Sequence, residues 1–170
     1  MHPLVKIINI DGFFNQDQAT QMYNCVRNLQ YKESEFGKEI PEFYLIAPDA
    51  NEQFSAILGA EVEVLEEYSG RFRYPSLFIH FEGFDTLNEW VFAVALDNST
   101  FNVYESLKGP KNALEGHDLP YRDLFAWDLT INYLLKPGQG VMFRPWLFHS
   151  FDSGLIQTFR LREKDGKKTN

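Results

Sequence analysis

Hydrophobic and polar positions follow two different periods along this chain. Near its start, an apolar run over residues 4–10 has the composition of a β-strand and is closed by an Asp-Gly pair. Asn15, followed three residues later by Gln18, has the spacing of a helix capping box. The apolar side chains after it recur at intervals of three and four residues, so the pattern predicts an amphipathic helix over residues 16–29.

The stretch that follows is less regular. Residues 30–41 are polar and predict irregular structure, whereas the apolar residues 43–46 predict a short strand. A second, shorter helix is expected over residues 50–58. It should end at Gly59, because glycine is favoured directly after a helix C-terminus.

From residue 61 onward, apolar side chains alternate with others, as they do along half-buried strands. Residues 107–128 have weak periodicity and predict a long loop with at most one helical turn. Many short strands separated by turn signals favour a sandwich or barrel. We therefore expect a mainly β, α+β domain spanning residues 1–170, with a helical layer over 1–60 and a β core over 61–165. The predicted strands are 61–65, 70–74, 76–82, 90–97, 101–105, 129–134, 140–144, 146–150 and 155–162.

Composition narrows the class of protein. The chain has 170 residues, 16% of them aromatic, which fits one domain with a β-rich interior. Its net charge of −8 argues against nucleic acid and membrane surfaces as partners. The single cysteine, Cys25, cannot form an intramolecular disulfide and favours a reducing compartment. With no recognisable signal peptide and no long apolar segment, we expect a cytoplasmic protein of undetermined oligomeric state.

Two histidines and one carboxylate have the residue types and strand contexts of a metal site. His80 and Glu82 lie two residues apart in a predicted strand, so their side chains should point to the same face. His149 lies in a second strand-like run, after a proline-glycine turn, and is the best candidate for a third ligand. Two histidines and one carboxylate form the facial triad that suits Fe(II) and O₂ chemistry. His117, in the long loop, and His2, at the terminus, are weaker candidates.

The same residues have a simpler interpretation. A histidine two residues from an acidic residue arises by chance in many proteins, and a half-buried His80 could simply hydrogen-bond Glu82 or a backbone carbonyl. What favours the metal site is the joint pattern. The turn before His149 and the strand arginine after it, Arg160, accompany the two histidines and the carboxylate.

The C-terminal half of the chain resembles the double-stranded β-helix core, of jelly-roll or cupin-like type, of the 2-oxoglutarate- and Fe(II)-dependent oxygenases of the prolyl-hydroxylase-like kind. His80-Phe-Glu82 stands at the first metal motif of that family, and His149 stands at its second histidine. Residues 90–97 resemble the strand after the first motif, and residues 137–143 resemble the turn and strand before the second histidine. The resemblance covers roughly residues 5–30 and 70–162.

This resemblance implies an oxidoreductase with Fe(II) held by His80, Glu82 and His149 and with 2-oxoglutarate as co-substrate. Arg160, eleven residues after His149, stands at the position that binds the distal carboxylate of 2-oxoglutarate. Arginine suits that role because its planar fork matches a carboxylate at two points. The implied reaction is hydroxylation of a small-molecule or peptide substrate that the sequence does not identify.

The chain departs from the family in two places. Glu82 stands where aspartate is commoner, and its extra methylene shifts the position of the carboxylate oxygens. Ala95 stands near the position of a tyrosine that contacts 2-oxoglutarate. Candidates for the tyrosine's contact are Tyr74, Tyr104 and Thr158. Arg162, on the same strand face as Arg160, is a rival for the contact with the distal carboxylate.

Two other functions therefore stay open beside an active dioxygenase. The first is a catalytically inactive fold of the oxygenase type that serves as a binding module. The second is a metal-binding barrel of cupin type, such as an isomerase or a sugar-binding protein, although that class usually has more histidines around its site.

Overall fold

The computed structural model describes residues 6–34, 37–119 and 122–164. Short 3₁₀ turns occur at Glu66–Tyr68 and Leu124–Ala126. In chain order, the helices and strands are β1 (Ile7–Ile10), α1 (Gln16–Val26), β2 (Lys32–Ser34), β3 (Gly37–Tyr44), α2 (Ala50–Leu58), β4 (Val62–Val64), β5 (Arg71–Pro75), β6 (Glu89–Ala95), β7 (Ser99–Ser106), β8 (Trp127–Leu135), β9 (Gly140–Phe143), β10 (Phe148–Asp152) and β11 (Ile156–Glu163).

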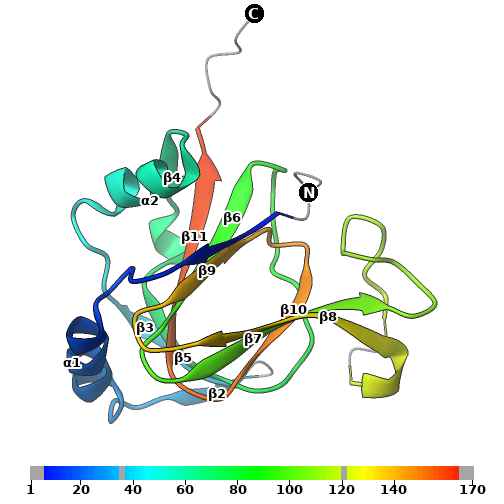
Figure 1. The fold of residues 1–170 in the computed structure, drawn as a ribbon, viewed down its shortest axis with the longest axis horizontal. Helices are drawn as coiled ribbons and strands as arrows, with labels where there is room; N and C mark the ends of the chain where they lie inside the picture. The colour runs from blue at the N-terminus through cyan, green and yellow to red at the C-terminus, as the bar shows by residue number, and fades with distance from the viewer. Residues whose placement is uncertain (1–5, 35–36, 120–121, 165–170) are drawn as a thin grey trace, which may run out of the picture.

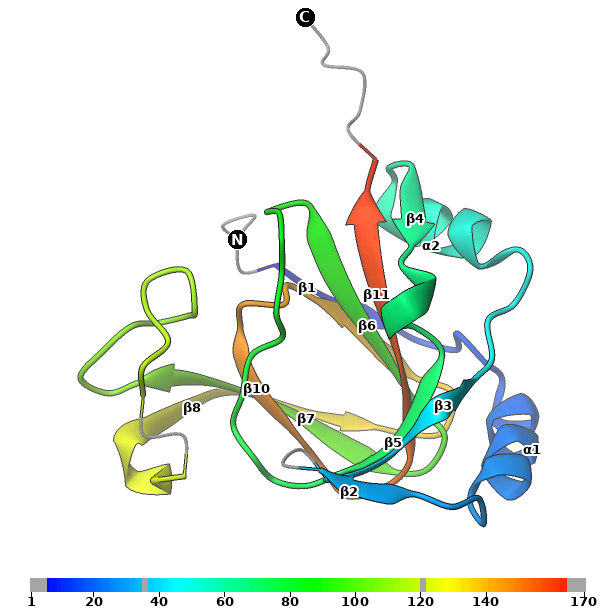
Figure 2. The same ribbon diagram turned by 180° about the vertical axis from the view of Figure 1, so that it is seen from behind.

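The strands form two antiparallel sheets that face each other (Figure 1). The larger sheet has the order β1-β9-β6-β11-β5-β3-β2, with β4 also paired to β11. The smaller sheet has the order β10-β7-β8, and an isolated bridge between His80 and His149 places the β5–β6 connection beside β10 (Figure 2). The fold is therefore mainly β and of the jelly-roll, cupin-like type, as the sequence predicts.

The central strand β6 shows why the larger sheet is buried on both faces. Every residue of β6 is buried, and alternate side chains enter different hydrophobic clusters. Val91, Ala93 and Ala95 join the cluster between the two sheets, together with Phe101, Val141 and Ile156 among others. Their neighbours Trp90, Phe92 and Val94 join the cluster on the outer face. A strand covered on both faces reads as a continuous apolar run, which residues 90–96 are.

Both helices cover the outer face of the larger sheet, on the side of the molecule away from the long β7–β8 connection (Figure 1). From α2, the fully buried Phe54 contacts Phe92 of β6 and Phe159 of β11, with ring centroids 5.0 and 5.3 Å apart. From α1, Val26 packs with Phe72 of β5 in a smaller cluster. Among the described residues, no helix is long and apolar enough to cross a membrane.

The N-terminal signal predicted for the first helix and the C-terminal signal predicted for the second are confirmed. The capping box of α1 is present, because the Asn15 side chain accepts the N–H of Gln18 and the Gln18 side chain accepts the N–H of Asn15. The helix ends at Val26, three residues earlier than predicted, and the Tyr31 hydroxyl donates to the Val26 carbonyl. The second helix has the predicted bounds, and Gly59 follows it in the left-handed conformation with φ of 67°.

Two element predictions are wrong. Residues 30–41 were expected to be irregular, but β2 pairs with the first part of β3, and β3 pairs with β5. Segment 1–60 therefore adds three strands to the larger sheet beside its helices. Residues 76–82 were expected to form a strand, yet the β-pairing within this segment consists of one isolated bridge, at His80. In the loop expected over 107–128, the described residues contain one 3₁₀ turn, Leu124–Ala126, and end in the start of β8.

Candidate metal centre

Backbone pairing brings the two histidines together from segments far apart in the chain. The His80 N–H donates to the carbonyl of His149 at 2.9 Å, and the His149 N–H donates to the carbonyl of His80 at 2.8 Å. Residues directly opposite in an antiparallel pair place their side chains on the same face. The two imidazoles are consequently adjacent, with ring centroids 4.3 Å apart.

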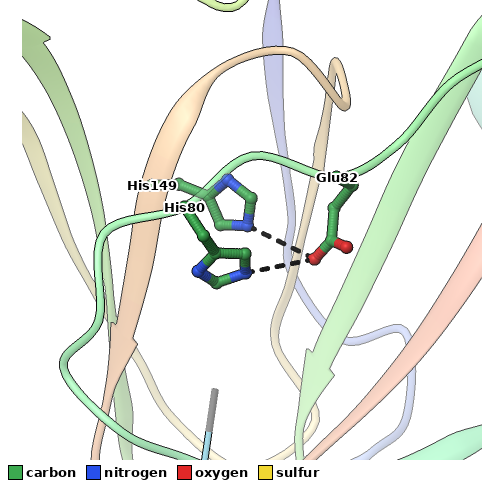
Figure 3. A group of neighbouring side chains, drawn as sticks. All are labelled: His80, Glu82 and His149. Atoms are coloured by element: carbon green, nitrogen blue, oxygen red, sulfur yellow. Dashed lines mark hydrogen bonds and ion pairs between the residues drawn. The ribbon is translucent and has the colours of Figure 1, made fainter. Parts of the chain in front are cut away.

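Glu82 completes a cluster that lies between the two sheets (Figure 3). Its backbone N–H donates to the carbonyl of Pro145 at 2.7 Å, which ties this part of the β5–β6 connection to the turn before β10. Its Oε1 lies 3.2 Å from Nε2 of His80 and 3.6 Å from Nε2 of His149. One ligand atom from each of the three residues lies within 4.8 Å of the others.

The Nδ1 atom of each histidine contacts the carbonyl oxygen of the residue two positions earlier. Nδ1 of His80 lies 2.8 Å from the carbonyl oxygen of Phe78, and Nδ1 of His149 lies 2.8 Å from that of Leu147. A carbonyl can only accept, so Nδ1 carries the proton in both rings. Nε2 of each ring faces Glu82, and in the neutral ring this nitrogen carries the lone pair that a metal ion would meet, the tautomer that metal-ligating histidines adopt.

The environment of the cluster favours neutral imidazole beside ionised carboxylate. Burial and the neighbouring His80 lower the pKa of His149, although contact with Glu82 and the Leu147 carbonyl acts the other way. Burial tends to raise the pKa of Glu82, but His149, His80 and the Arg73 guanidinium outweigh it and hold that pKa well below its ordinary range. These are the protonation states that metal ligands require.

A divalent metal ion fits this donor set. The Nε2 atom of His149 is buried and has no hydrogen-bond partner among the described residues. Leaving a buried polar atom unpaired costs about 1–3 kcal/mol, so such atoms usually have a further role. Here metal ligation fits that role, because two imidazole nitrogens and one carboxylate oxygen point to one location (Figure 3).

Aromatic side chains enclose the buried histidine. The ring of His149 lies 4.6 Å from that of Phe143, 6.0 Å from that of Phe151 and 6.1 Å from that of Phe101, measured between centroids. His149 itself is fully buried, whereas the Glu82 side chain is 24% exposed. Access to the cluster is therefore from the Glu82 side.

A cavity of about 340 Å³ lies on that accessible side. Two residues that the sequence analysis singled out for the co-substrate line it, Thr158 and Arg160 of β11. The Arg160 Nη2 atom lies 3.9 Å from Oε2 of Glu82, and its Nη1 atom donates to the Gly83 carbonyl. The cavity is lined by Glu39, Glu67, Tyr68, Arg71, Arg73, Glu82, Val91, Thr158, Phe159 and Arg160.

The remaining residues proposed from the sequence lie elsewhere. The Tyr74 hydroxyl donates to the Arg27 carbonyl, beside Tyr31, which places its ring against the outer face near α1. Tyr104 pairs with Phe148, one position from His149, so it faces the opposite side of the smaller sheet, and its hydroxyl contacts Ser150 at 3.1 Å.

Two further candidates also lie outside the triad. The guanidinium of Arg162 lies 3.6 Å from Asp85 and 3.7 Å from Glu89, and Arg162 does not line the cavity. The ring of His117 lies near that of Phe81, with centroids 5.6 Å apart, and is not in the ligand cluster.

Sequence reasoning missed the arginines of β5. Arg71 and Arg73 alternate with Phe72, and both line the cavity beside Glu82. Their spacing of two residues shows that they share a face, but the sequence does not say which face. The position of Phe72 decides it, because Phe72 packs against α1 on the outer side and so directs the arginines inward.

Comparison with known proteins gives similarity at the level of the fold. No family model and no curated protein matches the chain. HygX from Streptomyces hygroscopicus with nickel and 2-oxoglutarate bound has a TM-score of 0.55 at 11% identity, covering 95% of this chain and 84% of that one. The same protein with hygromycin B also bound gives 0.57 at 9% identity over the same shares of the two chains. SnoN, the non-heme alpha ketoglutarate dependent epimerase from nogalamycin biosynthesis, gives 0.54 at 11% identity, covering 94% and 79%.

Proposed function

We propose that this protein is a 2-oxoglutarate- and Fe(II)-dependent dioxygenase that hydroxylates a small-molecule or peptide substrate. The observation that carries the proposal is the convergence of His80, Glu82 and His149, whose ligand atoms lie within 4.8 Å of one another. Two histidines and one carboxylate with open positions suit Fe(II) and O₂. The shared fold of HygX, crystallised with nickel and 2-oxoglutarate, supports the choice of co-substrate.

In this proposal, Nε2 of His80, Nε2 of His149 and a carboxylate oxygen of Glu82 would hold the iron. When bound, the iron lets O₂ and 2-oxoglutarate react to give succinate and CO₂, with the second oxygen atom inserted into a C–H bond of the substrate. The Phe78 and Leu147 carbonyls keep both imidazoles in the ligating tautomer. The aromatic side chains around His149 exclude water on the buried side.

The cavity beside Glu82 is the proposed co-substrate pocket. Its volume of about 340 Å³ accommodates a five-carbon dicarboxylate, and its wall carries arginines that can pair with a carboxylate. Thr158 adds a hydroxyl on the same wall. Epimerisation is the second candidate function, because SnoN shares the fold at a comparable TM-score and is an epimerase.

Anaerobic titration of the metal-free protein with Fe(II), and then with 2-oxoglutarate, tests the proposal. We expect the weak visible charge-transfer band of an iron-chelated keto acid. His149→Ala should abolish it, because that substitution removes one of the three ligands. The matched control is His117→Ala. The His117 ring lies near Phe81 outside the triad, so this variant should keep the band.

The possible results separate the candidate functions. A band that depends on His149 supports the proposal, and release of succinate under O₂ then distinguishes turnover from a binding module. Iron binding without a band would favour a cupin-type metal protein. No metal binding at all would make His80 and Glu82 structural residues and leave the similarity to oxygenases as one of fold alone.

A further inference from the structure

Three arginines line the cavity beside Glu82, together with the carboxylates of Glu39, Glu67 and Glu82 itself. Arg71 and Arg73 reach it from β5, and Arg160 reaches it from the neighbouring strand β11. Cross-strand pairing aligns Arg71 with Thr158 and Arg73 with Ile156, so the three arginines sit at successive levels on the inner face. Their present contacts show which of them is available to a ligand.

Arg160 and Arg71 already have backbone partners. Arg160 donates to the Gly83 carbonyl, and its guanidinium lies 3.9 Å from both Glu82 and the fully buried Glu89. The Nη2 atom of Arg71 donates to the Glu67 carbonyl at 3.0 Å. A ligand carboxylate at either guanidinium would have to share these donors.

Arg73 is held more loosely, although its side chain is only 17% exposed. Its Nη2 lies 3.5 Å from Glu39 and its Nη1 lies 3.8 Å from Glu82, both longer than a charge-assisted hydrogen bond. Its Nε is buried and has no hydrogen-bond partner within the described part of the chain. Arg73 is therefore a largely desolvated cation with incomplete contacts.

Metal binding at the triad would leave Arg73 with still fewer partners. The Glu82 oxygen that faces Arg73, Oε1, is the same oxygen that lies nearest to both imidazoles. If Oε1 ligates a divalent ion, its negative charge is shared with that ion and no longer balances the guanidinium. A partly buried arginine beside a cation needs another anion, and a carboxylate next to the metal supplies one.

We propose that Arg73 of β5 anchors the distal carboxylate of the keto acid, exchanging its contact with Glu82 for a two-point contact with the co-substrate. This inference rests on the proposed function. It assigns the contact to β5 and not to the β11 position that Arg160 occupies. Glu39 orients the guanidinium from the neighbouring strand β3, where it pairs with Arg73.

The test compares two ligands on the same metal-loaded protein. 2-Oxopentanoate has the keto acid end of 2-oxoglutarate but carries a methyl group in place of the distal carboxylate. The ratio of their dissociation constants, measured anaerobically on the Ni(II)-loaded protein by calorimetry, reports the distal carboxylate alone. Any effect of a substitution on the metal centre acts on both ligands and cancels in the ratio.

We expect Arg73→Met to reduce the preference for 2-oxoglutarate roughly tenfold or more, the range of a lost charge-assisted contact. Arg73→Lys should restore part of it, since lysine keeps the charge but not the planar fork. Arg162→Met is the matched control and should keep the wild-type ratio, because Arg162 lies outside the cavity. If Arg73→Met does not fold, Arg73→Gln, which can still donate to Glu39, takes its place.

An unchanged ratio in Arg73→Met would overturn the inference and leave the proposed function intact, and a collapsed ratio in Arg160→Met would then identify Arg160 as the anchor. A wild-type protein that binds neither keto acid would instead overturn the proposed function, and the inference with it. A ratio that collapses in Arg73→Met but is kept in Arg160→Met supports the inference, whereas a collapse in both variants would overturn the assignment of the contact to β5 alone.

Discussion

Glu89 shows how a residue that is not a ligand holds the triad in position. It is 2% exposed, and its Oε2 accepts the backbone N–H groups of Asp85 and Thr86, each at 2.6 Å. Its Oε1 lies 3.9 Å from Arg160 and 3.7 Å from Arg162. The carboxylate thus closes the turn directly after Glu82 and links it to β11.

Glu89→Gln should therefore destabilise the protein. The amide keeps the shape but loses the charge that two guanidiniums face, and we expect the free energy of unfolding in urea to fall by about 2 kcal/mol. Glu105→Gln is the control: Glu105 forms an exposed ion pair with Lys111 at 3.4 Å, and such pairs contribute about 0–1 kcal/mol. Equal losses in the two variants would contradict a structural role for Glu89.

At the scale of elements, β5 connects the helical layer to the site. Phe72 faces α1, and the arginines on either side of it face the cavity beside Glu82. A shift of the strand by one residue would exchange the two faces, placing Arg71 and Arg73 in the hydrophobic cluster and Phe72 in the cavity. Packing of α1 on Phe72 consequently helps to fix the register on which the proposed co-substrate pocket depends.

Removing the N-terminal cap of α1 should lower the free energy of unfolding by the contribution of one capping hydrogen bond. Asn15→Ala removes the acceptor for the Gln18 N–H, and we expect the free energy of unfolding to fall by about 1 kcal/mol. Asn24→Ala, at an exposed position inside the same helix, should change it by less than about 0.5 kcal/mol. Chemical denaturation of the two variants gives the comparison, and an Asn24→Ala loss as large as that of Asn15→Ala would argue against the cap.

At the scale of the whole molecule, the larger sheet separates the helix-covered hydrophobic clusters from the core that surrounds the triad. Its outer face carries α1, α2 and their hydrophobic clusters, and its inner face meets the smaller sheet around the triad. Phe54 belongs to the outer cluster and Phe143 to the inner one, where its ring contacts that of His149. Both side chains are fully buried.

This separation predicts different consequences for two similar substitutions. Phe54→Leu and Phe143→Leu should each lower the free energy of unfolding by about 1–3 kcal/mol, because both change the shape of a packed core. Phe143→Leu should also weaken Ni(II) binding roughly tenfold, as loss of a residue that supports a ligand does, while Phe54→Leu should not. Calorimetric titration below the melting range measures both affinities. Equal affinities in the two variants would show that the His149 ring does not depend on Phe143.

Much of the fold follows from local patterns in the sequence. The capping box at Asn15, the glycine that ends α2 and the alternating strands from residue 61 onward depend on neighbours within a few residues. Segment 30–41 could not be predicted in this way. The side chains of β2 are exposed and polar, and β3 becomes a strand because β5 offers its backbone hydrogen bonds.

The sequence by itself determined most of the element types, the mainly β class and the three residues whose types suit a metal, since periodicity and residue chemistry are local properties. Tertiary structure alone decided that His80 pairs with His149, sixty-nine residues later, and that Glu82 reaches both imidazoles. It also decided that Arg73 faces the cavity while Tyr74 faces α1. These facts depend on strand order and on which face of β5 the helix covers. Both are set by burial of the whole apolar surface, and no segment of the chain carries that information alone.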